Sequence, residues 1–142
     1  DLHGCITEML RVSADKIATM VAEWLRVGFC QGNFNADNCL VGGRTMDYGP
    51  FGFMDEYNPL FAKWTGSGDH FGFLNQPAAG YVNFAVLAES MMLALKQTEK
   101  GDTEIIKAED QILNLARKTF QRKVDEMWSL RWDMIQRIYR GL

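Results

Sequence analysis

Apolar side chains recur at every third or fourth position in four stretches of the chain, and this spacing predicts amphipathic α-helices. The stretches cover residues 6–26, 81–98, about 102–124 and about 128–140. Ser13 and Asp15 are residue types that begin helices, so the first stretch could be two helices rather than one. The pattern as a whole predicts a mainly α-helical fold.

The spacing changes after the first helical stretch. Residues 27–30 form a short apolar run that favours a buried strand or a strand-like segment, whereas residues 31–38 are rich in turn-forming types and predict a loop. Gly42-Gly43 divides residues 39–46 into two short runs, which predicts a small β-hairpin. Residues 50–80 hold all three prolines but are too apolar for a linker, so we expect an ordered loop there.

Composition narrows the class of protein. The chain has 142 residues, of which 47% are hydrophobic and 23% charged, a balance typical of a globular domain with a sizeable core. The formal net charge of −3 gives no indication of nucleic acid or an anionic membrane as partner. No apolar run approaches the length of a membrane span, and the N-terminal residues resemble no targeting leader. Cys5, Cys30 and Cys39 lack the spacing of a disulfide framework or zinc site.

Two oxygen-bearing side chains flank the predicted hairpin. Asn38 ends the loop before the hairpin. Asp47 directly follows the hairpin and is nine residues after Asn38. Phosphoryl-type transfer needs a divalent cation beside the nucleotide, and in protein-kinase-like folds an Asn after the catalytic loop and an Asp after the next hairpin hold it. The order of helix, loop, hairpin, ordered loop and helices therefore indicates the C-terminal lobe of a protein-kinase-like fold, with Asn38 and Asp47 as metal ligands.

The position of the usual catalytic base differs from this pattern. Gln31-Gly32-Asn33 stands where many small-molecule kinases of this fold have His-Gly-Asp, and an Asn side chain cannot accept a proton. Asp37 is the only ionisable residue of the loop. Either Asp37 acts as the base from a shifted position, or the loop does not carry out ordinary hydroxyl phosphorylation. By its residue pattern alone the chain is typical of a pseudokinase.

A denser set of motifs surrounds these residues. It comprises Gly28-Phe29, Asn35-Ala36-Asp37-Asn38, Asp47-Tyr48-Gly49-Pro50-Phe51-Gly52-Phe53-Met54-Asp55 and, further on, Asn75-Gln76-Pro77. Together these motifs resemble the signature of the selenoprotein O family, kinase-like proteins that transfer AMP from ATP to protein hydroxyls. The similarity is dense over residues 28–60 and thinner over 75–95. The family usually has His in place of Gln31 and Thr in place of Ala36, and neither difference removes a predicted ligand.

The resemblance implies roles for three residues. Asp37 would accept the proton of the hydroxyl that is modified. Asn38 and Asp47 would hold Mg²⁺ or Mn²⁺, and Asp47 would also contact the nucleotide. The implied substrates are ATP and the Ser, Thr or Tyr hydroxyls of proteins. The implied location is mitochondrial in eukaryotes and cytoplasmic in bacteria.

The resemblance also implies that residues 1–142 form part of a larger fold. They would comprise the catalytic loop 31–38, the hairpin 39–46, the Asp-Tyr-Gly triplet 47–49, the ordered loop 50–80 and a helical subdomain 81–142. A glycine-rich cover and a phosphate-binding Lys would belong to an N-terminal lobe, which the 36 residues before Asp37 cannot supply. We therefore expect the chain alone to be close to inactive, with an apolar face that binds this lobe or a partner subunit.

Two interpretations of this partial lobe remain open. The chain could be the catalytic-lobe fragment of a pseudokinase-like protein adenylyltransferase. It could instead be a non-catalytic, kinase-derived interaction subunit of a larger assembly.

Overall fold

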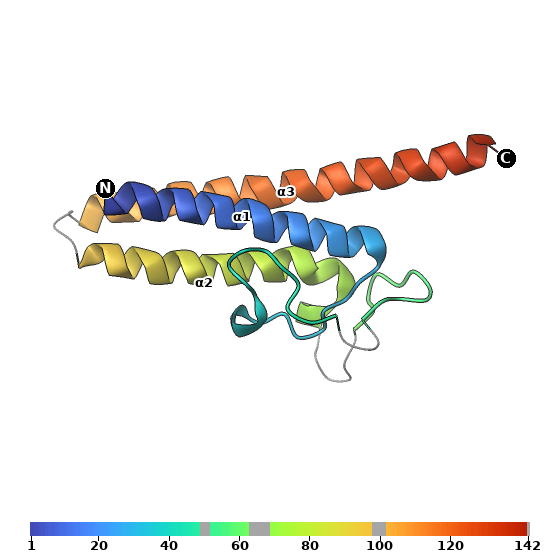
Figure 1. Ribbon diagram of the computed structural model, residues 1–142, viewed down its shortest axis with the longest axis horizontal. Helices are drawn as coiled ribbons and strands as arrows, with labels where there is room; N and C mark the ends of the chain where they lie inside the picture. Colours follow the sequence, from blue (N-terminus) through green and yellow to red (C-terminus); the bar gives the residue numbers. More distant parts are fainter. Residues whose placement is uncertain (49–51, 63–68, 98–101, 142) are drawn as a thin grey trace.

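Three long α-helices form the body of the protein, and an irregular segment lies against one side of them (Figure 1). The computed structural model describes residues 1–48, 52–62, 69–97 and 102–141. Its elements are α1 (Leu2–Val27), η1 (Ala36–Asn38), η2 (Asp69–Phe71), η3 (Phe73–Asn75), α2 (Gln76–Lys96) and α3 (Asp102–Gly141), where η denotes a 3₁₀ turn. α1 and α3 run in the same direction, and α2 runs opposite to both (Figure 1). The prediction of a mainly helical fold is confirmed.

α1 is one uninterrupted helix, so the helix predicted over residues 6–26 is confirmed and the alternative of a split near Ser13 and Asp15 is not observed. The Asp1 carboxylate caps its start by accepting from the backbone N–H of His3, and Gly28 ends it in a left-handed conformation with φ 76°. Ser13 lies in the middle of α1, where its buried side chain donates to the carbonyl of Val41 at 2.8 Å. Its hydroxyl therefore binds a distant loop instead of capping a second helix.

α2 packs against both other helices and is apolar over most of its surface. It begins with Pro77 in its first turn, where the missing N–H has no helical partner to lose. Phe73–Lys96 is the one helical segment of the described chain that is long and apolar enough to cross a membrane. A core helix meets the same criterion, and α2 contributes residues such as Phe84, Ala88 and Met92 to the core, so this is weak evidence for a span.

α3 continues through the predicted gap between two C-terminal helices. Phe120, Val124 and Met127 follow one another at helical spacing and face the core, so the apolar face is not interrupted there. The Arg131 guanidinium also donates to the carbonyl of Leu25 at 3.0 Å, which joins α3 to the end of α1. A single helix from Asp102 to Gly141 therefore replaces the two that the sequence predicts.

The predicted β-hairpin over residues 39–46 is not present. The segment contains a turn in which the N–H of Gly43 donates to the carbonyl of Leu40 at 2.9 Å, but no strand pairing. Its polar groups bind α1 instead, through Ser13 and through Trp24, whose indole N–H donates to Thr45. The Val41 carbonyl, a backbone group that could pair across a hairpin, is thus used to attach the segment to α1, and the Thr45 side chain makes a second attachment.

Residues 27–30 form no strand: Val27 ends α1, and Phe29 makes a single antiparallel bridge with Phe53. Two hydrogen bonds make it, from the N–H of Cys30 to Gly52 at 2.7 Å and from the N–H of Met54 to Gly28 at 2.9 Å. Gly49 and parts of the expected loop 50–80 lie outside the described residues, and the end of that range forms η2, η3 and the first turn of α2. The kinase-like lobe itself stays a prediction.

Candidate functional site

The residues predicted to carry the chemistry begin in η1, within the segment that follows α1. η1 is closed by hydrogen bonds from the N–H of Asn38 to Asn35 at 3.0 Å and from the N–H of Cys39 to Ala36 at 3.4 Å. Asp37 is exposed on this turn, and Asn38 is half-buried. The structure therefore presents these two side chains consecutively on one short, hydrogen-bonded turn.

Side-chain amides brace the loop that leads into η1. The N–H of Asn33 donates to Gln31 Oε1 at 2.7 Å, and Asn35 Nδ2 donates to Asn33 Oδ1 at 2.8 Å. Asn38 Nδ2 donates to the backbone carbonyl of Asn33 at 2.9 Å. Asn33, at the position of the usual base, therefore acts as a hydrogen-bonding centre for the loop.

The segment before Asp47 is clamped onto α1. Gly43 has φ +62°, and a Cβ there would overlap the backbone carbonyl of Lys16, so only glycine fits this contact without strain. Two residues on, Thr45 Oγ1 accepts from Trp24 Nε1 at 2.8 Å. This attachment fixes the backbone two residues ahead of Asp47.

The residue after Asp47 is held by aromatic contacts. The Tyr48 ring lies 5.1 Å from that of Phe29 and 5.9 Å from that of Phe53, centroid to centroid. Asp47 itself is exposed and takes part in at least one polar or electrostatic interaction. Asp47 thus lies between two anchored neighbours, Thr45 and Tyr48, on a support separate from η1.

Two side chains that hold the loop before η1 were not predicted to do so from the sequence. Gln76 and Asn83, buried on α2, bind the backbone of residues 29–34. In the sequence, Gln76 stands out only as part of the family resemblance. Their signal is the presence of two amides seven residues apart on a mainly apolar helix, because seven residues make two helical turns and place both on one face.

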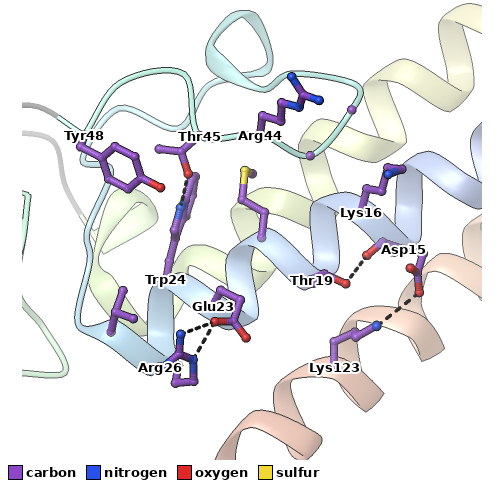
Figure 2. A pocket seen from close by; sticks show the side chains of 14 residues that line it. Asp15, Lys16, Thr19, Glu23, Trp24, Arg26, Arg44, Thr45, Tyr48 and Lys123 are labelled. Carbon is purple, nitrogen blue, oxygen red and sulfur yellow. Dashed lines mark hydrogen bonds and ion pairs between the residues drawn. The ribbon is translucent and has the colours of Figure 1, made fainter.

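A cleft of about 860 Å³ lies between α1 and the segment 42–45, with Lys123 of α3 at its edge (Figure 2). Trp24 and Thr45 meet at one end of it, and the Asp15 carboxylate lies 3.6 Å from Lys123 Nζ at the other. Asp37 and Asn38 do not line this cleft. The predicted base Asp37 and the predicted metal ligand Asn38 therefore lie outside the cleft, on η1.

The end of η1 carries a half-buried thiol. Burial raises the pKa of Cys39 from its ordinary value of 9.0 to about 11, while a hydrogen bond with Asn83 acts in the opposite direction. The thiol is therefore protonated at neutral pH and is a poor nucleophile. Cys39 is a packing residue rather than a second reactive centre beside Asp37.

The described residues contain no group of three or more His, Cys, Asp or Glu side chains that could hold a metal ion. A site made of Asn38 and Asp47 is of another kind, because it offers one amide oxygen and one carboxylate. Mg²⁺ is commonly held by one or two protein ligands together with substrate phosphates and water. The donor chemistry of these two residues therefore fits a nucleotide-dependent Mg²⁺ site.

Comparison with known proteins identifies relatives of the chain. The family model described as protein adenylyltransferase SelO matches residues 5–135. Curated relatives named protein nucleotidyltransferase YdiU include one from Cytophaga hutchinsonii, 38% identical over 67% of this chain and 19% of its own length. Others come from Rhizobium meliloti, 43% identical over 59% of this chain and 17% of its own length, and from Thioalkalivibrio sulfidiphilus, 36% identical over 70% and 20%.

The chain spans about a fifth of the length of these relatives. No solved structure matches it significantly. The family model covers most of the chain, including the loop with Asp37 and Asn38, the segment with Asp47 and nearly all of the three helices. This protein therefore belongs to the SelO family.

Proposed function

We propose that the chain is the catalytic-lobe part of a protein adenylyltransferase, which moves AMP from Mg–ATP to a Ser, Thr or Tyr hydroxyl of a protein. The name of the family model and the names of the relatives support nucleotidyl transfer as the class of reaction. Because the chain spans about a fifth of those relatives, other parts of a family-length protein would supply the cover and the phosphate-binding groups. A kinase-like C-terminal lobe is part of this proposal.

Asn38 and Asp47 are the proposed cation ligands. Asn38 uses its Nδ2 donor on the carbonyl of Asn33, a bond that orients the amide and supports the Oδ1 atom as the proposed ligand. Asp47 adds an exposed carboxylate, and its anchored neighbours limit where that carboxylate can lie. When bound, Mg²⁺ or Mn²⁺ neutralises charge on the triphosphate.

Asp37 is the proposed proton acceptor. The hydroxyl oxygen of the protein substrate forms a bond to the α-phosphorus of ATP, and the bond from that phosphorus to the bridging oxygen breaks. Pyrophosphate leaves with the electron pair, and the hydroxyl proton passes to the Asp37 carboxylate. An exposed carboxylate on η1 is open to a protein substrate, as this role requires.

The observation that carries the proposal is the pairing of an exposed carboxylate with a fixed amide on η1, within a region that matches the SelO family. The direct experiment uses a family-length protein that contains this chain, with ATP labelled at either the α- or the γ-phosphate. Transfer of the α-label to protein is expected. Transfer of the γ-label would show phosphorylation and overturn the AMP assignment.

Variants separate the two kinds of role. Asp47→Ala is expected to abolish both transfer and Mg–ATP binding. Asp37→Ala is expected to abolish transfer while binding is retained. Asp110→Ala, an exposed carboxylate on α3, serves as the control and should change neither. Unchanged transfer in Asp47→Ala would remove that residue from the mechanism.

A further inference from the structure

Two amide side chains are buried on one face of α2. Gln76 is 1% exposed and Asn83 is 7% exposed, and they are two helical turns apart. A buried amide without partners destabilises a protein by about 1–3 kcal/mol, so native structures satisfy such groups. The partners of these two side chains therefore indicate what this face of α2 holds.

Gln76 uses both ends of its amide on one backbone segment. Its Oε1 accepts from the N–H of Gln31 at 3.0 Å, and its Nε2 donates to the carbonyl of Phe29 at 2.9 Å. A backbone N–H can only donate and a carbonyl can only accept, so the partners define the orientation of the amide. Glu in place of Gln76 would lose the donor, and an aliphatic residue would lose both bonds.

Asn83 holds the same segment further along. Its Nδ2 donates to the carbonyl of Phe34 at 2.8 Å, and its side chain lines a small pocket together with Ala36 and Cys39. The Phe34 ring is 1% exposed and packs 4.8 Å from the Trp24 ring, so this point of the loop is held from α1 as well. Asp37 and Asn38 follow Phe34 by three and four residues.

We propose that Gln76 and Asn83 are positioning residues, which set the place of Asp37 and Asn38 by fixing the backbone that leads into η1. The inference rests on the proposed function for its consequence in metal binding, but the contacts themselves do not depend on it. Gln76 and Asn83 act through backbone atoms and touch no reacting group. α2 thus serves as the base on which η1 is held.

The test compares Mn²⁺ binding by the 142-residue chain with that of three variants. Gln76→Met and Asn83→Leu remove the amides without burying a charge, and Gln121→Met makes the first change at an exposed site on α3. Mn²⁺ binding is followed by paramagnetic broadening of the backbone amide signals of Asp37, Asn38 and Asp47. Thermal unfolding is measured in parallel, so that affinity is compared only among folded proteins.

Loss of either amide is expected to weaken Mn²⁺ binding about tenfold or more, because partners that orient metal ligands have effects of this size. Gln121→Met should bind as the unsubstituted chain does. A purely structural role predicts a different result, namely a lower melting temperature with unchanged Mn²⁺ affinity of the folded variants. That result would overturn the inference.

Hydrogen exchange of backbone amides tests the inference without metal, and its first measurement uses only the unsubstituted chain. In the unsubstituted chain the backbone N–H of Gln31, bonded to Gln76, should exchange as slowly as the amides of α2, and fast exchange would overturn the inference. In folded variants the N–H of Asn38 should exchange about tenfold faster or more while α1 and α3 keep their protection. If the unsubstituted chain shows no Mn²⁺ broadening at all, exchange still decides the role of the two amides.

Discussion

The indole N–H of Trp24 donates a hydrogen bond of 2.8 Å to the Thr45 hydroxyl, which lies 21 residues further along the chain. Trp24 is 3% exposed, so little water can replace this acceptor. The bond joins the C-terminal half of α1 to the segment that leads to Asp47 (Figure 2). It therefore connects a buried residue of α1 with the segment that leads to a predicted ligand of the nucleotide site.

Thr45→Val removes this acceptor and leaves the shape of the side chain nearly unchanged. We expect the free energy of unfolding to fall by about 1–3 kcal/mol, because a buried indole N–H loses its partner. Urea unfolding followed by tryptophan fluorescence measures the change. Thr45→Ser keeps the hydroxyl and should lose much less, and equal stabilities of the Val and Ser variants would contradict the role of the bond.

The neighbouring glycines, Gly42 and Gly43, give a matched pair of substitutions. Gly43→Ala should destabilise the protein by about 2 kcal/mol or more, because the residue has a positive φ and its new Cβ would overlap the backbone of Lys16. A Cβ at Gly42 meets nothing within 4 Å, so Gly42→Ala should be close to neutral. Chemical unfolding of both variants tests this, and a similar loss at both positions would contradict the close contact with α1.

Cys39 should react slowly with thiol reagents. At pH 8 iodoacetamide should label the exposed Cys5 well before Cys39, because Cys39 is half-buried and its pKa is about 11. Labelling of Cys39 should accelerate as the pH rises from 9 towards 11. Peptide mass spectrometry assigns each site, with Cys5→Ser to isolate the slower reaction, and rapid labelling of Cys39 at pH 8 would be the contrary result.

The same pKa has a consequence for stability. A pKa that is higher in the folded chain than the ordinary value of 9.0 means that folding favours the protonated thiol. The stabilising contribution is therefore complete below pH 9 and is lost as the pH rises through about 11. Cys39→Ser should lose less stability over this range than the unsubstituted chain, which urea midpoints at pH 8, 9.5 and 11 would reveal.

Arg131 joins the two parallel helices near the end of α1. Its guanidinium donates to the carbonyl of Leu25 and lies 5.8 Å from the Trp128 ring and 5.9 Å from the Tyr57 ring. Arg131→Met should lower the free energy of unfolding by about 1 kcal/mol or more, since a charge-assisted hydrogen bond is lost. Arg140→Met, an exposed change in the last turn of α3, is the control and should have little effect.

Much of the fold could be predicted from local patterns. The helical stretches were found because one face of each helix is buried, and burial of one face imposes an apolar repeat. The number of helices was harder to predict. Ser13 and Asp15 have the sequence character of a helix start, yet α1 passes through them because Ser13 finds its partner on the loop at Val41. The C-terminal break was wrong for a similar reason, since the core contacts of Val124 and Met127 continue the helix.

The candidate site divides in the same way. Asp37, Asn38 and Asp47 could be named from the sequence because their motif is local, and their roles stay predictions. The groups that hold them could not be named, since Trp24, Gln76 and Asn83 lie far from their partners along the chain. The spacing of Gln76 and Asn83 on one face of a mainly apolar helix marks them as unusual, but it does not identify their partners on the loop.

The sequence by itself determined the helical content, the SelO family and the residues on which a nucleotide-transfer proposal rests, because periodicity and motifs are short-range properties of a chain. Only the tertiary structure decided that residues 39–46 are attached to α1 instead of forming a hairpin, and that α2 carries the loop of Asp37. Each backbone group of such a segment has several suitable partners, and packing of the helices determines which of them comes within hydrogen-bonding distance.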